Sequence, residues 1–387
     1  MTVWMVIFGS ILLFFTLCFI YLAHKTTRII PILFPGTKIA AWSNRKRRYV
    51  VIFILAMIIA LIALAIELIN AMVIVFYLAM LWLSGDLLNL FCGKVFKRRF
   101  SPKAVAAAAW ILTIVVLGTG WYLDHHVWQK NYQITVNKKI DHFRIGMIAD
   151  VHLGTTFDAE GFKAHLTRIA AQAPDILVVV GDYVDDGTSK AEMIKATQYL
   201  GQTPTRKGIF FVEGNHDKAY YGAERRGFSL ADLHQELIKN GITILRDEVL
   251  KLDDQVYLIG RRDLSWEKEQ HGQRLAVAEL KQNLDPDKLI IVLDHQPTGF
   301  EAQAQAKVDL VLSGHTHGGQ LFPFNKVGEW TKVNDLIYGH KQIGESHFIV
   351  TSGISNWALK FKTGTKSEFV IIDLQGPSNG HASNLGN

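Results

Sequence analysis

Cysteine is almost absent from this sequence. Among its 387 residues only Cys18 and Cys92 occur, so the C-terminal part from residue 93 onward has none. That part can contain neither a disulfide framework nor a metal site built from thiolates. A metal ion bound there would have to use histidine, carboxylate or amide ligands.

Acidic residues are scarce at the start of the chain. The first 123 residues contain only Glu67 and Asp86 against twelve lysines and arginines, whereas the remainder carries 29 basic and 33 acidic residues. The pI of about 9.1 therefore arises from the N-terminal part alone. Because the remainder has a net charge of −4, its composition argues against a surface for long nucleic acids, which bind basic domains.

Charge is also missing from several long apolar runs. Residues 3–23 contain no charged residue, residues 49–91 contain only two, with a polar break at 67–70, and residues 104–123 form a further run. The lengths suit bilayer-spanning helices, two of them within residues 49–91, so we predict an all-α region of about four transmembrane helices. The first run has neither a basic leader nor a small-residue cleavage site, which argues against a signal peptide.

The basic residues of this region lie in two loops between the predicted helices. One loop holds Lys25, Arg28, Lys38 and residues 45–48, and the other holds Lys94, residues 97–99 and Lys103. Basic loops stay on the cytoplasmic side of a membrane. We therefore predict a multi-pass protein of the cytoplasmic (inner) membrane, with everything after residue 123 on the extracytoplasmic side. Few polar residues face inward from these spans, so their expected role is anchoring.

The pattern changes from residue 141 onward, where apolar runs alternate with helical periodicity. A helix is expected after Asp158, a good N-cap residue, with Phe162, Leu166 and Ile169 on one face. The apolar runs show no alternation with polar residues, so their strands should be covered on both faces, as in layered α/β proteins. The strands are expected within residues 143–152, 175–186, 208–217, 256–263, 288–297, 308–317, 347–353 and 368–374.

These patterns divide the chain into four parts. We predict a membrane domain at 1–123, a linker at 124–140, an α/β domain at 141–375 and a disordered tail at 376–387, which is rich in glycine, serine and asparagine. The residues able to carry chemistry lie in the α/β domain.

Metal-ligating residue types follow five of the predicted strands, at the point where each strand ends. Ligands of layered α/β proteins gather at the carboxyl ends of strands, so these side chains should meet in one place. Histidine, carboxylate and amide ligands suit divalent Mn, Fe, Zn, Ni or Co. There are more of them than one ion requires, and two ions bridged by a shared carboxylate would use them all. The strand-end residues are Asp150, His152, Asp182, Asn215, His216, His295, His315 and His317.

The motifs at these strand ends resemble those of a known family. In order along the chain they are "ADVH" (149–152), "GDYVDD" (181–186), "GNHD" (214–217), "LDHQP" (293–297) and "GHTHGG" (314–319). The set is similar to that of the calcineurin-like metallophosphoesterase superfamily, in particular its bacterial membrane-anchored subgroup, over about residues 141–375. The resemblance implies an α/β fold, a four-layer αββα sandwich with a dinuclear metal site at one edge.

The resemblance also implies a role for each site residue. By motif position, the first metal ion would be bound by Asp150, His152 and His317, the second by Asn215, His295 and His315, and both by the bridging Asp182. His216 resembles the family's catalytic histidine, and Asp185 the carboxylate that orients it. Asp186 stands where the family's protein serine/threonine phosphatase branch has an arginine, which argues against that branch.

We therefore predict a membrane-anchored, dinuclear metal-dependent phosphoesterase. It would hydrolyse phosphoester or pyrophosphate bonds of lipid or envelope-related substrates by attack of a metal-activated hydroxide, with His216 protonating the leaving group. A nucleotide phosphodiesterase of the same fold is an alternative. A non-catalytic membrane sensor or scaffold is a third hypothesis, which the complete set of ligands disfavours. No nucleic-acid partner is expected, and the sequence leaves the oligomeric state open.

Overall fold

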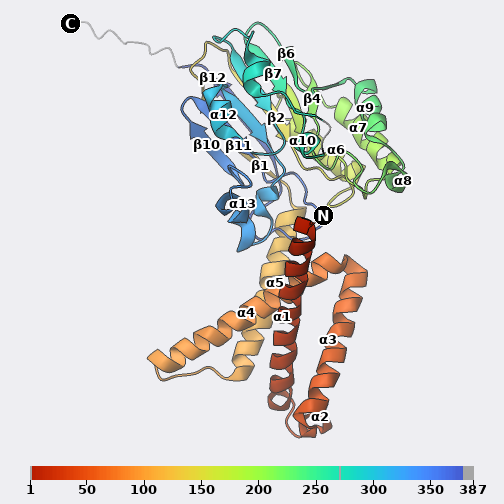
Figure 1. The fold of residues 1–387 in the computed structure, drawn as a ribbon, viewed down its shortest axis with the longest axis vertical. Coiled ribbons are helices and arrows are strands. Elements are labelled where there is room, and N and C mark those ends of the chain that lie inside the picture. The colour runs from red at the N-terminus through yellow and green to blue at the C-terminus, as the bar shows by residue number, and fades with distance from the viewer. Residues whose placement is uncertain (1, 270–271, 378–387) are drawn as a thin grey trace, which may run out of the picture. The chain divides into compact units, whose positions relative to one another are not determined.

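A computed structural model describes residues 2–269 and 272–377 of the chain (Figure 1). The chain forms two compact units, one up to Trp121 and one from Tyr122 onward. Of the tail predicted to be disordered, residues 376–387, the positions from 378 onward lie outside the described residues.

The first unit consists of helices. Four of them are long and apolar enough to cross a membrane, as the apolar runs predicted. The break expected at residues 67–70 is a turn at Glu67, whose positive φ of 71° separates α3 from α4. The helices are α1 (Thr2–Leu33), α2 (Lys38–Ala41), α3 (Asn44–Ile66), α4 (Leu68–Val95) and α5 (Pro102–His125), the last of which continues into the second unit.

Many of the basic residues of the first unit lie in the ends of helices, not in loops as expected. Lys25 and Arg28 belong to α1, and residues 45–48 belong to α3. Lysine and arginine are good helix formers, so a helix can continue through a basic stretch. Lys25 also forms an ion pair with Asp86 of α4 at 2.6 Å, which neutralises one of the two acidic residues of this unit.

The second unit is built on two six-stranded sheets. The first has the strand order β1-β12-β2-β3-β4-β5 and the second β10-β11-β9-β8-β7-β6. The strands that precede the predicted site residues are parallel neighbours, β2, β3 and β4 in one sheet and β8 and β9 in the other. The strands are β1 (Trp128–Thr135), β2 (Phe143–Ile148), β3 (Ile176–Val180), β4 (Ile209–Val212), β5 (Ile242–Ile244), β6 (Glu248–Lys251), β7 (Val256–Gly260), β8 (Leu289–Leu293), β9 (Leu310–Ser313), β10 (Gly339–Ile343), β11 (Ser346–Val350) and β12 (Glu368–Gln375).

Short and medium helices connect these strands. The helix predicted after Asp158 is α6, and the Asp158 carboxylate accepts a hydrogen bond from Gly161 N at 2.9 Å as its N-cap. The helices are α6 (Ala159–Ala170), α7 (Lys190–Gly201), α8 (Ala223–Arg226), α9 (Leu230–Lys239), α10 (Ser265–Lys268), α11 (Val277–Lys281), α12 (Phe300–Gln305) and α13 (Val327–Trp330), with 3-10 turns η1 (His317–Gly319) and η2 (Phe324–Lys326).

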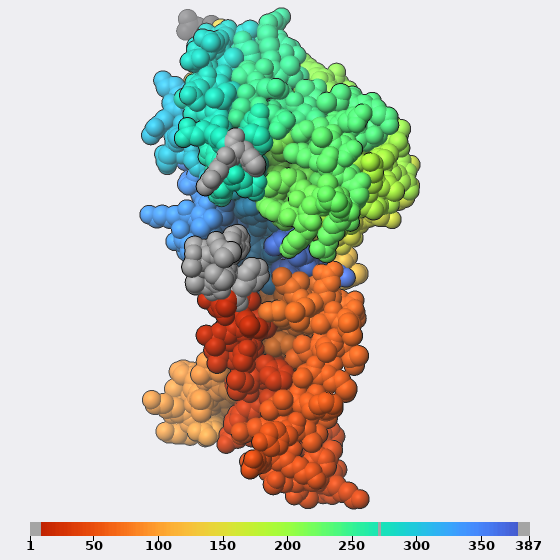
Figure 2. Space-filling model, turned by 45° about the vertical axis from the view of Figure 1, so that its right-hand side comes forward, coloured from red at the N-terminus to blue at the C-terminus, as the bar shows by residue number. Residues whose placement is uncertain are grey.

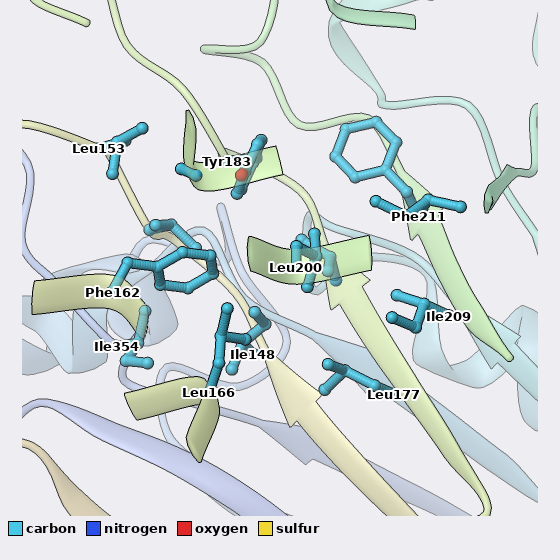
Figure 3. Close-up of a cluster of buried hydrophobic side chains, with 14 of the residues drawn as sticks. Ile148, Leu153, Phe162, Leu166, Leu177, Tyr183, Leu200, Ile209, Phe211 and Ile354 are labelled. Carbon is cyan, nitrogen blue, oxygen red and sulfur yellow. The ribbon is translucent and has the colours of Figure 1, made fainter. Parts of the chain in front are cut away.

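The two sheets face each other and helices cover their outer faces, which confirms the predicted four-layer αββα sandwich (Figure 1). Met147 of β2 and Ile291 of β8 belong to the buried layer between the sheets. Phe162 of α6 and Leu200 of α7 pack on the outer face of the first sheet (Figure 3), and Phe300 of α12 packs on that of the second. Each such buried side chain stabilises the fold by roughly 2 kcal/mol.

Residues 124–140, predicted to be a linker, contain a strand of the first sheet. β1 pairs in parallel with β12 along its whole length, from Trp128 opposite Glu368 to Thr135 opposite Gln375. It is an edge strand with mostly half-buried or exposed side chains, so no apolar run marks it in the sequence. The other strands that were not predicted, β5, β6 and β10, also lie at sheet edges.

Candidate metal centre

The predicted site residues come together at the carboxyl ends of five strands from both sheets. In the first sheet the site residues follow strands β2, β3 and β4, and in the second sheet they follow β8 and β9. Within each of three groups, the candidate ligand atoms lie within 4.8 Å of one another. The groups are Asp150–His152–His317, His152–Asp185–His216 and Asp182–His295–His315. Only Asn215, the seventh predicted ligand, is outside these groups of histidines and carboxylates.

Asn215 nevertheless lies beside them. It precedes His216, whose backbone N–H donates to Asp182 Oδ1 at 2.7 Å. The amide nitrogen of Asn215 donates to the Tyr220 hydroxyl at 3.1 Å, which orients the side chain. Among the described residues nothing donates to its buried Oδ1 atom. A buried carbonyl oxygen that lacks a donor is suited to ligate a cation.

Three buried histidines have Nδ1 held by an acceptor. Carbonyl and carboxylate oxygens can only accept, so Nδ1 carries the proton in each neutral ring and Nε2 presents a lone pair. The contacts are His295 Nδ1 with Val180 O at 2.8 Å, His152 Nδ1 with Asp185 Oδ2 at 3.2 Å, and His317 Nδ1 with Ser355 O at 3.4 Å.

The Nε2 atoms of these three histidines face carboxylates. Asp182 Oδ2 lies 3.0 Å from His295 Nε2 and 3.6 Å from His152 Nε2, and Asp150 Oδ1 lies 3.8 Å from His317 Nε2. Electron-rich atoms at such distances repel unless a cation or a proton lies between them. Histidines that donate Nδ1–H outward and offer Nε2 inward are the usual ligands of metal ions. The donor set therefore fits divalent ions, with Asp182 shared between two groups of histidines.

The electrostatics of the site favour neutral His315 and His317 rings beside an ionised Asp182. Burial lowers the pKa of His315 to about 4 and also lowers the pKa of His317, so both rings are neutral, the form that binds metal. Burial alone would raise the pKa of Asp182, but the charges of His295 and His216 hold it well below its usual range. Asp182 is therefore ionised, as a bridging ligand must be. Burial would lower the pKa of His295, yet the charge of Asp182 raises it, so a proton on His295 Nε2 competes with a metal ion for the place beside Asp182 Oδ2.

The backbone holds several of these side chains in an uncommon conformation. Among the described residues thirteen other than glycine have a positive φ, and five of them are predicted metal ligands. A positive φ costs a residue with a Cβ on the order of 1–2 kcal/mol, and such residues cluster at functional sites. The five are Asp150, His152, Asp182, His315 and His317.

Glycine is required at position 214 because another segment comes close. A Cβ at Gly214 would overlap both the Oδ1 and the backbone N of Asp182, closer than atoms tolerate. The missing side chain thus lets the turns after β3 and β4 approach closely enough to place Asp182 beside Asn215 and His216.

Gly214→Ala should therefore displace Asp182 and weaken metal binding. We expect metal affinity to fall by roughly 10- to 100-fold, as when a supporting contact of a ligand is lost, with activity falling in step. Metal titration of the purified protein measures the effect. Gly187→Ala is the matched control, because a Cβ there meets nothing within 4 Å. Equal metal affinity in both variants would contradict the role of this contact.

Asp185 holds two histidines at once. Its Oδ2 lies 3.2 Å from His152 Nδ1, and its Oδ1 lies 3.2 Å from His216 Nδ1. Burial would raise the pKa of Asp185, but hydrogen bonds from both rings hold it well below its usual range. Burial would likewise lower the pKa of His216, yet the charges of Asp182 and Asp185 raise it. The arrangement thus favours a protonated His216 next to the candidate metal ligands.

Asp217 connects two turns of the site by hydrogen bonds, although no role was predicted for it from the sequence. Its buried carboxylate accepts hydrogen bonds from four backbone N–H groups in the turns after β3 and β4, and so ties the two turns together. The donors are Asp182 N at 3.0 Å, Tyr183 N at 2.9 Å, Val184 N at 3.1 Å and Gly214 N at 2.7 Å. Its place at the end of "GNHD", directly after two site residues, is the signal that could have identified it.

Lys362 holds a loop that contacts the site, and no sequence pattern identifies this residue. It is fully buried, and its Nζ donates to Ser352 O at 2.7 Å and Ser355 O at 2.9 Å. Ser355 O also contacts His317 Nδ1, and Ser355 N donates to Asp150 O at 3.2 Å. Lys362 therefore fixes the loop after β11 that orients His317.

Comparison with known proteins agrees with this geometry. Residues 143–319 match the family model of the calcineurin-like phosphoesterases. A transmembrane protein with metallophosphoesterase domain from Bos taurus is 30% identical over 242 residues, which cover 60% of this chain and 53% of that protein. An uncharacterized metallophosphoesterase from Campylobacter jejuni is 30% identical over 235 residues, covering 60% of this chain and 59% of that protein. The matches thus span between half and three fifths of these relatives.

A solved structure is similar at a lower level. The dimetal phosphatase from Danio rerio shares 12% identity and a TM-score of 0.35 over 54% of this chain and 86% of that chain. The matched residues 143–319 contain every site residue predicted from the strand ends. Residues 143–319 of the second unit therefore form a calcineurin-like phosphoesterase domain, and both relatives are named as metallophosphoesterases.

Proposed function

We propose that this protein is a membrane-anchored phosphoesterase with a dinuclear metal centre. The observation that carries the proposal is the set of three histidines whose Nδ1 atoms are held outward while Nε2 faces the carboxylates of Asp150 and Asp182. The first ion would be held by Asp150, His152 and His317, the second by Asn215, His295 and His315, and both by Asp182. Divalent Mn, Fe, Zn, Ni or Co suit these donors.

His216 is the proposed general acid. When bound, the two ions would supply a water of lowered pKa and neutralise the phosphoryl oxygens. Asp185 holds Nδ1 of His216, which leaves Nε2 as the nitrogen that exchanges a proton with the substrate. The rings of Tyr220 and Trp357, each 5.1 Å away between centroids, restrict the orientation of the imidazole. A protonated His216 would donate its proton to the departing alkoxide as the P–O bond breaks.

The proposed substrates are phosphoesters or pyrophosphates of lipids or envelope intermediates. Four long apolar helices support anchoring in the cytoplasmic (inner) membrane, and the excess of basic residues before position 123 supports an extracytoplasmic catalytic unit. The Bos taurus relative is likewise named as a transmembrane protein with a metallophosphoesterase domain. A tethered catalytic unit meets membrane-bound phosphates at a high effective concentration.

Hydrolysis of bis(p-nitrophenyl) phosphate by the purified full-length protein tests this function. We expect turnover with added Mn²⁺ and its loss on chelation, because the proposed nucleophile is a metal-activated hydroxide and the second unit contains no cysteine that could replace it. A panel of lipid phosphates and nucleotides then compares the two substrate classes, and faster turnover of nucleotides would favour a nucleotide phosphodiesterase. Activity that survives chelation, or none with any of the five metals, would contradict the proposal.

A further inference from the structure

Exposed apolar side chains are concentrated in a segment that follows the last predicted metal ligand, His317, in the sequence. Residues 321–333, here called the aromatic segment, include η2 and α13. Five of the eleven exposed large apolar side chains in the described part of the second unit belong to these thirteen residues, and Trp330 and Val333 are 71% and 62% exposed. The other three are Phe322, Phe324 and Val327. Such a concentration marks an interaction surface.

The aromatic segment is a folded element that displays these side chains outward. The Glu329 carboxylate accepts a hydrogen bond from Ile337 N at 2.8 Å, and Val333 N donates to Gly328 O at 2.9 Å. Figure 2 shows that blue side chains, from the C-terminal part of the second unit, protrude from the surface of that unit. Because hydrogen bonds hold the backbone, the exposure of Trp330 and Val333 belongs to the fold of the segment.

The aromatic segment is connected to the point where the last apolar helix ends. Ser367 N donates to Leu123 O at 3.0 Å, and Ser367 Oγ donates to Asp124 O at 2.7 Å, at the C-terminal end of α5. Four residues before Ser367, the Thr363 hydroxyl accepts from Phe322 N at 2.9 Å. Residues 363–367 thus link the start of the aromatic segment to the end of α5, where the chain leaves the bilayer if α5 spans the membrane.

The residues just before the aromatic segment connect the same end of it to the metal centre. The segment begins four residues after His317. Gln320 Nε2 donates to Asn356 Oδ1 at 2.8 Å and to Trp357 O at 3.1 Å. The Trp357 ring, 42% exposed, packs on His216 with 5.1 Å between centroids. A surface that binds the aromatic segment would therefore lie close to the proposed general acid.

We propose that the aromatic segment inserts into the headgroup region of the lipid bilayer and brings the metal centre to membrane-bound phosphoesters. Tryptophan with flanking lysines is typical of segments that lie in a membrane interface, and Lys326 and Lys332 flank Trp330 here. The one acidic side chain, Glu329, accepts a backbone hydrogen bond from Ile337. The choice of a lipid substrate rests on the proposed function, whereas insertion itself does not.

Fluorescence quenching in proteoliposomes tests the insertion without any need for activity. The full-length protein with Cys18→Ala and Cys92→Ala receives one new cysteine, Val333→Cys, labelled with an environment-sensitive fluorophore. Ile238→Cys is the control, because Ile238 is 64% exposed on α9, away from α13 in Figure 1. In phosphatidylethanolamine–phosphatidylglycerol vesicles, acyl-chain nitroxide lipids should quench label 333 at least about twofold more than label 238.

Equal quenching at the two positions would overturn the proposal. Protection of label 333 from an aqueous quencher without quenching by lipid would also overturn it, and would indicate contact with a second copy of the chain instead. Both outcomes are independent of whether the protein hydrolyses any ester.

Turnover of two substrates with the same reporter tests the second half of the proposal. Trp330→Asp should lower hydrolysis of a p-nitrophenyl phosphatidyl diester in vesicles by roughly tenfold and leave soluble bis(p-nitrophenyl) phosphate unaffected, because an interfacial aromatic is lost. Ile238→Asp should change neither rate. Equal loss on both substrates would contradict a role in lipid access. Failure of the unmodified protein on both substrates would instead defeat the proposed function.

Discussion

Asp182→Asn is expected to abolish turnover and to remove most of the bound metal. Asp182 is buried, its Oδ2 faces both His295 and His152, and its Oδ1 accepts the backbone N–H of His216 at 2.7 Å. Asparagine keeps the size of the side chain but loses the negative charge and one of the two oxygens. We expect activity to fall by roughly 10³-fold or more. Removal of one preorganised electrostatic group typically lowers kcat by about 10²- to 10³-fold, and Asp182→Asn should also remove metal.

Metal analysis of purified Asp182→Asn, together with its turnover, checks this expectation. Asp309→Asn is the matched control, because Asp309 is also buried but lies at the start of β9, where it accepts a hydrogen bond from Ile290 N at 2.7 Å. The control should keep its metal. Two ions still bound in Asp182→Asn, with turnover unchanged, would contradict the bridging role.

His216→Ala should leave the metal bound and still remove most of the turnover. His216 is not among the proposed metal ligands, and its Nδ1 is held by Asp185 at 3.2 Å. Loss of a general acid typically slows a reaction by roughly 10²- to 10⁴-fold. The decrease should be larger for an alkyl phosphodiester than for bis(p-nitrophenyl) phosphate, because an alkoxide needs a proton more than a nitrophenolate does.

The ratio of the two rates separates this role from a merely structural one. A structural defect would lower both rates equally, whereas loss of an acid lowers mainly the rate with the poor leaving group. His142→Ala is the control, since His142 is exposed and contacts Asp373 at 2.8 Å, on β12. Full activity with both substrates, or loss of metal from His216→Ala, would be evidence against the assignment.

The success of the strand predictions depended on position in the sheet. Eight strands were expected from apolar runs, and all eight lie inside the two sheets. The four that were not expected, β1, β5, β6 and β10, are the four edge strands. A central strand is covered on both faces and needs a continuous apolar run, whereas an edge strand such as Trp128–Thr135 remains partly exposed and keeps polar residues.

The candidate site could likewise be predicted only in part from the sequence. The residues at strand ends could be found because parallel strands bring their carboxyl ends to one edge. Asp217 and Lys362 could not be recognised as supports of the site, because their hydrogen bonds reach backbone groups of other segments. Nothing local distinguishes Lys362 from the neighbouring Lys360 and Lys366.

The sequence by itself determined the kinds of donor atom, their places after five strands and the apolar character of the first unit, because these are properties of short segments. Only the tertiary structure decided which nitrogen of each histidine faces inward. That choice depends on acceptors from elsewhere in the fold, Val180 O for His295, Asp185 for His152 and Ser355 O for His317. A ring nitrogen binds a cation only when its partner nitrogen carries the proton, so metal binding here depends on contacts between distant segments.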